Sequence, residues 1–319
     1  MTLKEKNKKL KIAIQMDSLN NIEKKTDSTL ALIEEALKRK YSVFIYTVDN
    51  LSLINNKAVA VCNKVLSCNT NKKDFLKIGH SKNIKLDIFD VLLVRQDPPF
   101  DMQYITATHI LEKLPPSCLV LNNPISIRNC PEKLLVMKFY HLMPPTLISR
   151  EFSKIIDFLN KYKKIVLKPL FGNGGKDVFF LTNKDPNLNI IINNLLLSRE
   201  HVIVQKFINK VKYGDKRVLL INGKPVGSVN RIPQDNEIRA NLHIGGLAKK
   251  TKLSKKDFLI CSEISHTLKS KGLFFTGIDI IDGYLTEINV TSPTCIREID
   301  QLNKTNISKL FWDEVNNIK

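Results

Sequence analysis

The chain has 319 residues, of which 43% are hydrophobic and 25% charged, a composition typical of a globular protein with two or three domains. No apolar run approaches the ~20 residues of a membrane span, and the lysine-rich N-terminus lacks a signal-peptide pattern, so we expect a cytoplasmic protein without a membrane partner. The formal charge of +19 could indicate nucleic-acid binding. The basic residues are scattered as singles and short pairs, however, which favours a site for an anionic small molecule.

The cysteines show no metal-binding or redox pattern. None of the six forms a C-x-x-C pair, and no histidine pair completes a zinc spacing. We therefore expect reduced and mostly buried thiols in a reducing cytosol. Cys295 is near the site predicted below, but it lacks a neighbouring histidine base, so we do not predict it to be a nucleophile.

The N-terminal part predicts a parallel sheet. Residues 11–16 and 43–48 are short apolar strands, and residues 26–40 between them form an amphipathic helix with a start signal at Asp27. A strand–helix–strand order is typical of parallel strands joined by a crossover helix. We therefore expect an α/β domain at this end of the chain.

Polar residues follow three predicted strands where the chain leaves the sheet. Asp17 follows the first strand, Arg95 follows a buried strand over 91–94, and Asn122 follows another over 119–121. Ligands of open α/β sheets bind beyond the carboxyl ends of strands, so these three side chains are candidate substrate contacts. The alternative, ordinary polar loop residues, remains open for each. No G-x-G-x-x-G follows the first strand, which argues against a dinucleotide-binding domain.

A glycine-rich loop follows a buried strand in the middle of the chain. The pattern predicts a helix over 131–142, with proline at its start, and we place the boundary of the first domain there. The later strand over 165–169 ends at Lys168-Pro169, and the glycines of 172–175 lead into a strand over 177–181. Glycines let backbone N–H groups approach phosphate oxygens and Lys168 adds a cation, so we predict a phosphate clamp. A hairpin turn without a ligand is the alternative.

A long polar loop interrupts the regular elements that follow. The pattern predicts helices over 152–162, 187–197 and 254–269, and strands over 201–207, 215–222 and 226–232. Residues 234–246 form no such element, and a loop of this length inside a compact domain is usually functional or disordered. Arg231 and Arg239 bracket it, and arginine suits two-point recognition of a carboxylate or phosphate.

The C-terminal hairpin predicts a metal site. Strands over 274–281 and 285–290 flank an Asp282-Gly283 turn signal, with Glu287 and Asn289 on one strand face. These hard oxygen ligands suit Mg²⁺, and Asp279 across the hairpin could add a third. The three share a face only if the turn absorbs an odd number of residues. We therefore expect a bulge at Gly283 or Tyr284, with Asp279 opposite Glu287.

Several stretches in one order resemble the ATP-grasp superfamily and, within it, the bacterial glutathione synthetase family. They are Asp97-Pro98-Pro99-Phe100-Asp101, Lys168-Pro169 with the glycine pair after it, Asp215-Lys216-Arg217-Val218, Arg231-Ile232-Pro233-Gln234 and residues 286–298. The resemblance covers nearly the whole chain. It implies an α/β fold, α+β in the C-terminal half, in which an ATP-grasp unit follows an N-terminal parallel-sheet domain. The implied divisions are a substrate-binding domain over 1–130, a central subdomain with the glycine-rich flap over 131–208, and a catalytic subdomain over 209–319.

The resemblance also implies roles for single residues. ATP would be bound by Lys133, Lys168, Gly172, Gly174, Gly175, Gln205, Lys206, Phe207, Ile208 and Asp215. Arg217 and Arg239 would be catalytic, holding the charge of an acyl phosphate and of substrate carboxylates. The expected substrate contacts are Asp17, Arg95, Asn122, Arg231, Asn241, Ser292, Pro293 and Thr294. The metal, Mg²⁺ or alternatively Mn²⁺, would be bound by Asp279, Glu287 and Asn289.

The implied activity is ATP-dependent ligation of γ-glutamylcysteine and glycine through an acyl phosphate, and the resemblance further suggests a homotetramer. The loop over 234–246 would act as a lid. Ala240 replaces a family glycine there, and His243-Ile244 replace two small residues, which puts the details of loop closure in question. A carboxylate–amine ligase with another peptide substrate is the alternative within the fold, and a nucleic-acid-binding protein is the alternative of another class.

Overall fold

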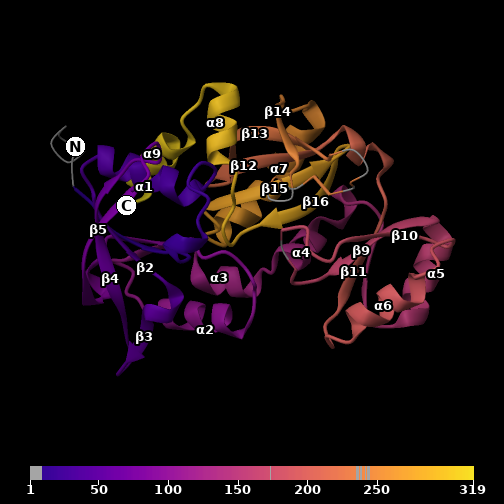
Figure 1. Ribbon diagram of the computed structural model, residues 1–319, viewed down its shortest axis with the longest axis horizontal. Helices are drawn as coiled ribbons and strands as arrows, with labels where there is room; N and C mark the ends of the chain where they lie inside the picture. The colour runs from indigo at the N-terminus through magenta and orange to yellow at the C-terminus, as the bar shows by residue number, and fades with distance from the viewer. Residues whose placement is uncertain (1–8, 173, 235–236, 238, 241, 243–244) are drawn as a thin grey trace.

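The structure is a computed structural model that describes residues 9–172, 174–234, 237, 239–240, 242 and 245–319. The described residues form three sheets, which follow one another along the chain. Figure 1 shows the N-terminal sheet at one end, the C-terminal sheet in the middle and the small central sheet at the opposite end. Within this part of the chain, no helix is long and apolar enough to cross a membrane.

The N-terminal sheet has a parallel centre, as the sequence predicts. Its parallel strands lie in the order β2 (Ser42–Tyr46), β1 (Lys11–Gln15), β6 (Val91–Val94) and β7 (Leu119–Leu121). Helix α1 (Ser28–Lys38) crosses between the first two strands, and the Asp27 carboxylate caps it by accepting a hydrogen bond from the Leu30 N–H at 2.6 Å.

The sequence interpretation missed the antiparallel part of this sheet. Strands β3 (Leu51–Ile54), β4 (Lys57–Cys68) and β5 (Leu76–Lys85) extend it beyond β2. Much of β5 is exposed, so its residues lack the apolar alternation that marks a half-buried strand. On the face of the sheet opposite α1, helix α2 (Met102–Leu111) packs against α3 (Pro124–Asn129).

The connection into the central sheet differs from the single helix predicted over 131–142. Helix α4 covers only Glu132–Leu135, and the 3-10 segment Val136–Leu142 follows with Phe139 outside the helical region. Glu132 and Lys133 are the first two residues of this short helix, and both line the cavity where the three sheets meet. Other 3-10 turns cover Leu19–Asn21, Val48–Asn50, Leu86–Ile88 and Asn209–Tyr213.

The central sheet is antiparallel. Its order is β10 (Phe179–Thr182), β9 (Lys164–Pro169), β11 (Val202–Lys206) and β8 (Thr146–Ser149). Helices α5 (Phe152–Tyr162) and α6 (Leu188–Leu196) bury their apolar residues with those of the sheet in one cluster (Figure 1). Strand β10 begins two residues later than predicted, which leaves a longer glycine-rich loop after β9.

The C-terminal sheet is also antiparallel, in the order β14 (Leu247–Lys250), β13 (Lys224–Ile232), β12 (Asp215–Ile221), β15 (Phe275–Ile281) and β16 (Tyr284–Asn289). Helix α7 (Lys255–Ser270) begins with a capping box in which Ser254 and Asp257 bond each other's backbone N–H groups. The buried residues of this helix share an apolar cluster with those of β12, β15 and β16.

The predicted register of the C-terminal hairpin is confirmed, but the predicted position of its bulge is wrong. Asp279 lies opposite Glu287, as expected. The turn itself is the two-residue Asp282-Gly283, with Ile281 opposite Tyr284, and the extra residue is Thr286, farther along β16. The Thr286 hydroxyl donates to the Asp279 carbonyl at 3.1 Å and so holds the bulge.

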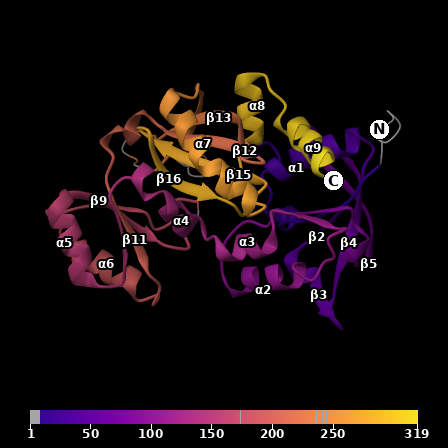
Figure 2. The same ribbon diagram turned by 180° about the vertical axis from the view of Figure 1, so that it is seen from behind.

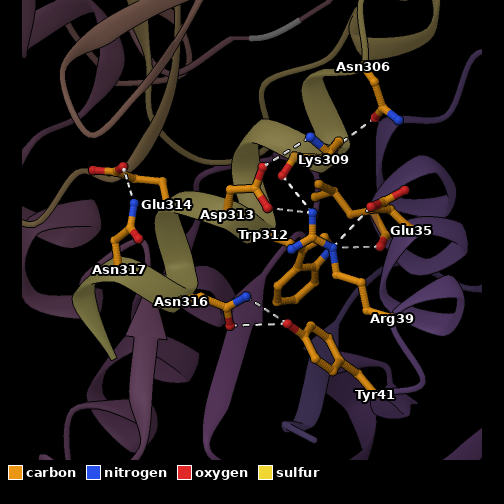
Figure 3. A network of polar contacts seen from close by, with 11 residues as sticks. Glu35, Arg39, Tyr41, Asn306, Lys309, Trp312, Asp313, Glu314, Asn316 and Asn317 are labelled. Atoms are coloured by element: carbon orange, nitrogen blue, oxygen red, sulfur yellow. Dashed lines mark hydrogen bonds and ion pairs between the residues drawn. The ribbon is translucent and has the colours of Figure 1, made fainter. Parts of the chain in front are cut away.

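The end of the chain returns to the N-terminal sheet. Helices α8 (Ile296–Asn303) and α9 (Ile307–Ile318) contribute to the apolar cluster that contains α1 and β1, and α9 lies beside α1 in both views (Figures 1 and 2). In Figure 3 the Arg39 guanidinium reaches Glu35 at 3.0 Å and Asp313 at 2.8 Å. The Trp312 indole N–H donates to the Leu32 carbonyl at 2.9 Å. The first and last parts of the chain therefore form one core.

Candidate active site

A cavity with a volume of about 730 Å³ lies where the three sheets meet. That size falls in the range of pockets that hold a nucleotide-sized ligand. Residues predicted for ATP, substrate and metal from the central and C-terminal segments line it together, and Glu23, Thr26, Asp97 and Pro98 of the N-terminal segment line it as well. The structure thus brings together side chains that are far apart in the sequence.

Two lysines lie together at one end of the cavity. Lys133 on α4 donates to the Gly172 carbonyl, and its Nζ lies 3.4 Å from Glu287 Oε1. Burial lowers the pKa of the Lys168 ammonium, and nearby Lys133 acts in the same direction, while Glu287 opposes it. Anionic oxygens bound here would stabilise the charged ammonium groups of both Lys133 and Lys168. This end of the cavity therefore suits a polyphosphate.

The glycine-rich loop covers the same end. Gly172, Gly174 and Gly175 line the cavity, and the last two have φ values of +62° and +78°, which side chains other than glycine rarely adopt. Phe171 stacks on Phe100 of the N-terminal domain, with ring centroids 6.2 Å apart. The backbone of this loop therefore faces the cavity, as a phosphate clamp requires.

Four charged residues form a cross-strand network on β13, β12 and β15. Arg217 lies opposite Asp279 and donates to both of its oxygens at 2.6 and 3.0 Å. Arg231 lies opposite Asp215 and reaches it at 2.5 Å, and it also reaches Asp279 at 3.0 Å. Opposite charges at paired positions stabilise neighbouring strands, and both arginines are also oriented along the cavity wall.

The two carboxylates of this network have opposite pKa shifts. Burial opposes ionisation of Asp279, but Arg217 and Arg231 outweigh it and hold the pKa of this carboxyl well below its usual range. Burial raises the pKa of Asp215 to about 6, with Asp279 adding to the rise and Arg231 opposing it. The network therefore carries a firmly ionised Asp279 beside a more easily protonated Asp215.

The expected metal ligands lie together on β15 and β16. Asp279 faces Glu287, and the Asn289 amide nitrogen is placed 3.4 Å from Asp279 Oδ2. Two carboxylates and an amide supply the hard oxygen donors that Mg²⁺ prefers, and a cation between the carboxylates would offset their repulsion. Among the residues described, no group of three or more His, Cys, Asp or Glu side chains forms a metal cage. The set therefore fits an ion that takes its remaining ligands from phosphate and water.

The end of β11 and the residues after it form part of the cavity wall that is predicted to bind ATP. Gln205, Lys206, Phe207 and Ile208 all line it. The Gln205 amide donates to Thr146 Oγ1 at 3.2 Å, and the Phe207 ring packs against Phe180 with centroids 4.6 Å apart. An apolar wall with backbone groups at its edge suits a planar heterocycle.

Part of the predicted substrate set lies in the cavity wall. Ser292 and Thr294 line it together with Arg231. Arg239 also lines it, but its guanidinium is paired with Glu237 at 2.6 Å and donates to the Gly175 carbonyl at 3.1 Å. Asn241 lies outside the described residues. The roles assigned to these residues remain predictions.

The other predicted substrate residues, Asp17, Arg95, Asn122 and Pro293, are not found in the cavity wall, and the first three are held by protein groups. Arg95 donates to Thr29 Oγ1 at 3.1 Å and to the Pro293 carbonyl at 3.0 Å. The Asn122 amide makes three hydrogen bonds of 2.7–2.8 Å to backbone groups of Phe275 and Val290. The Asp17 carboxylate accepts from the Asp97 N–H at 2.8 Å. These contacts support a structural role, and direct substrate binding by the three stays an untested prediction.

Several lining residues were not predicted from the sequence: Glu23, Thr26, Asp97, Glu132, Thr291, Cys295 and Glu298. The sequence signal for Asp97 was its position just after a strand end, two residues beyond Arg95. Glu132 immediately precedes Lys133, which was the available signal. Burial raises the pKa of the Cys295 thiol. All six cysteines are free, as expected.

Comparisons with known proteins agree with this geometry. The family model "Prokaryotic glutathione synthetase, N-terminal domain" matches residues 10–128, and "Prokaryotic glutathione synthetase, ATP-grasp domain" matches residues 132–304. A glutathione synthetase of Brucella melitensis biotype 1 is 45% identical over 96% of this chain and 98% of its own. The glutathione synthetase of Salmonella typhi is 40% identical over 96% and 98%.

Solved structures show the same fold at lower identity. D-cycloserine synthetase DcsG has a TM-score of 0.68 at 12% identity, covering 96% of this chain and 99% of its own. The ATP-grasp ligase PsnB with a minimal precursor has a TM-score of 0.64 at 14% identity, with coverages of 96% and 99%. The fold is therefore the expected ATP-grasp fold. The two family models together span nearly all of the sequence, and the chain belongs to the prokaryotic glutathione synthetase family.

Proposed function

We propose that the protein catalyses the ATP-dependent ligation of γ-L-glutamyl-L-cysteine and glycine to glutathione, releasing ADP and phosphate. The observation that carries the proposal is the meeting of Lys133, Lys168 and Arg231 in one cavity of a chain with such close and nearly full-length relatives. Both substrates of the first step are anions, and a cavity with these cations favours bringing them together.

The reaction has two steps. In the first, the cysteinyl carboxylate of γ-glutamylcysteine attacks the γ-phosphorus of ATP, the bond to the β-phosphate oxygen breaks, and an acyl phosphate and ADP form. In the second, the amine of glycine attacks the acyl carbon, phosphate leaves, and the nitrogen loses a proton. Lys133 and Lys168 bind the phosphates, while Arg217, Arg231 and Arg239 stabilise the negative charge that develops.

Asp279, Glu287 and Asn289 would hold a divalent cation beside the phosphates, and we propose Mg²⁺ with Mn²⁺ as a substitute. Bound there, the metal would neutralise phosphate charge. The residues themselves have a second task, because Asp279 orients Arg217 and Arg231 along the cavity wall. Asp279 thus holds both arginines in place before any ligand binds.

Water must be kept from the acyl phosphate, because this intermediate hydrolyses readily. The glycine-rich loop and the segment that carries Arg239 already touch through the bond from Arg239 Nη1 to the Gly175 carbonyl at 3.1 Å. We propose that these two segments close over the bound substrates as a lid. Ala240 is buried at this contact, which is compatible with the loss of the family glycine there.

The proposal is tested by following ADP release from purified protein given ATP, Mg²⁺, γ-glutamylcysteine and glycine, with product identified by mass spectrometry. Glutathione formation at a rate that requires all four components is expected. Release of ADP with another peptide or amine, but none with this pair, would instead establish the alternative ligase.

Assembly and location are proposed from the family resemblance. A homotetramer would elute at four times the mass of the chain in size-exclusion chromatography with light scattering, and a monomer or dimer would overturn it. A cytoplasmic location is proposed on the same basis, and fractionation of the source cells tests it.

A further inference from the structure

One carboxylate oxygen joins the phosphate and substrate sides of the cavity. Glu132 Oε1 accepts hydrogen bonds from the Val290 N–H at 2.9 Å, the Thr291 N–H at 3.2 Å and the Thr291 hydroxyl at 2.8 Å. This side chain also lines the cavity. Hydrogen bonds to an ionised carboxylate are stronger than neutral ones, so three donors on one oxygen hold this group firmly in place.

These bonds replace the partners that the chain loses where β16 stops. The strand ends at Asn289, so the N–H groups of Val290 and Thr291 have no neighbour in the sheet ladder. The two residues lie between the expected metal ligand Asn289 and the expected substrate contacts Ser292 and Thr294. Glu132 therefore fixes the direction in which the chain leaves β16, the strand that carries the expected metal ligands Glu287 and Asn289.

The other end of the same link reaches Lys133, which is proposed to bind phosphate. Glu132 begins the short helix α4, and the next residue, Lys133, contacts the Gly172 carbonyl and Glu287. The segment beyond Thr291 has its own second support, because Arg95 donates to the Pro293 carbonyl at 3.0 Å. Loss of Glu132 would thus free the part nearest the metal strand while the far part stays held.

We propose that Glu132 is a positioning residue, which sets the distance between the phosphate-binding Lys133 and the strand end that carries Asn289 and the substrate contacts. The proposal rests on the proposed ligase function for its kinetic consequences. Its consequences for metal-dependent nucleotide binding do not need turnover. The chemistry requires an acceptor at the Oε1 position, and the charge of the group is secondary.

Two substitutions separate the acceptor from the charge. Glu132→Gln keeps an amide oxygen that can accept all three bonds, so we expect kcat and the KM for γ-glutamylcysteine within about threefold of wild type. Glu132→Ala removes the acceptor. We expect its KM for γ-glutamylcysteine to rise at least tenfold and its kcat to fall about 10–100-fold, the usual effect of losing a group that orients metal ligands.

Nucleotide binding gives the readout that does not depend on turnover. The non-hydrolysable analogue AMP-PNP is titrated by calorimetry with and without Mg²⁺. In Glu132→Ala we expect metal-free affinity within about threefold of wild type, because both lysines remain. The gain in affinity on adding Mg²⁺ should be about tenfold smaller than in wild type. A wild-type protein inactive with γ-glutamylcysteine would overturn the proposed function and leave this measurement interpretable.

Asp300 provides the matched control. Its Oδ1 accepts from the Thr305 hydroxyl at 2.8 Å and the Ile307 N–H at 2.9 Å, the same kind of anchor between α8 and α9. Asp300→Ala should lower the melting temperature without changing the KM for γ-glutamylcysteine or the KM for ATP. If Glu132→Ala changes only stability, as this control does, or if Glu132→Gln is as defective as Glu132→Ala, the proposal is wrong. Should Glu132→Ala fail to fold, Thr291→Val removes one donor, and an unchanged response to Mg²⁺ there would also refute it.

Discussion

Substitution of Asp279 by asparagine tests the network that aligns the arginines. The carboxylate receives two hydrogen bonds from Arg217 and lies 3.0 Å from Arg231, and all three side chains are at most 7% exposed. Asparagine has nearly the same shape but no charge. The change therefore leaves two buried guanidinium groups with Asp215 as their nearest carboxylate.

The size of the effect follows from what remains after the change. Removing one partner of a buried ion pair costs about 3–5 kcal/mol, because the other charge stays desolvated without compensation. Arg231 keeps its 2.5 Å contact with Asp215, and the asparagine oxygen can still accept one bond from Arg217. We therefore expect the lower end, about 3 kcal/mol of unfolding free energy, or a melting temperature about 6 °C lower.

The assay is thermal unfolding without nucleotide or metal, so that ligand binding does not mask the loss. Asp282→Asn is the control, since Asp282 pairs with the exposed Lys210 in a turn and should change stability by less than about 0.5 kcal/mol. Asp279→Asn should also abolish turnover. A variant as stable as the control would refute the view that this carboxylate holds both arginines in place.

The pH dependence has a definite sign. The native pKa of Asp279 lies below its ordinary value of 3.8, so the unfolded state binds more protons between the two values. The contribution of Asp279 is therefore complete above about pH 3.8 and is lost as the pH falls below it. The stability difference between wild type and Asp279→Asn should therefore shrink as the pH falls below about 3.8.

Three further changes test other parts of the molecule. Glu287→Gln should abolish ADP release in the coupled assay while leaving the melting temperature nearly unchanged, and near-normal turnover would contradict its role at the metal. Lys168→Ala should raise the KM for ATP more than the KM for γ-glutamylcysteine, and an unchanged KM for ATP would count against the phosphate clamp. Trp312→Ala should lower the unfolding free energy by about 3–5 kcal/mol, because it removes a fully buried indole between α9 and α1. Chemical denaturation measures this, and a loss below about 1 kcal/mol would show that the C-terminal helix is not part of that core.

Local patterns determined much of this protein. The glycines after Lys168, the alternation around Glu287 and the cap at Asp27 act over a few residues, so the sequence alone indicates a phosphate loop, a strand with metal ligands and a helix start. The order of these stretches also made the family resemblance specific. Even the requirement that Asp279 face Glu287 followed from counting residues across the hairpin, because side chains alternate along a strand.

Tertiary structure decided what counting could not. The hairpin places its bulge at Thr286, where a hydroxyl bond to the Asp279 carbonyl holds it, and the turn residues keep a simple two-residue form. Arg95 and Asn122 stand at strand ends like ligand contacts, yet each donates hydrogen bonds to the backbone of a distant segment. The partner of Glu132 lies 158 residues away, and only the packing of α4 against β16 brings the two together. Spacing in the sequence carries no information about such distant partners, because they meet only when separately formed elements pack.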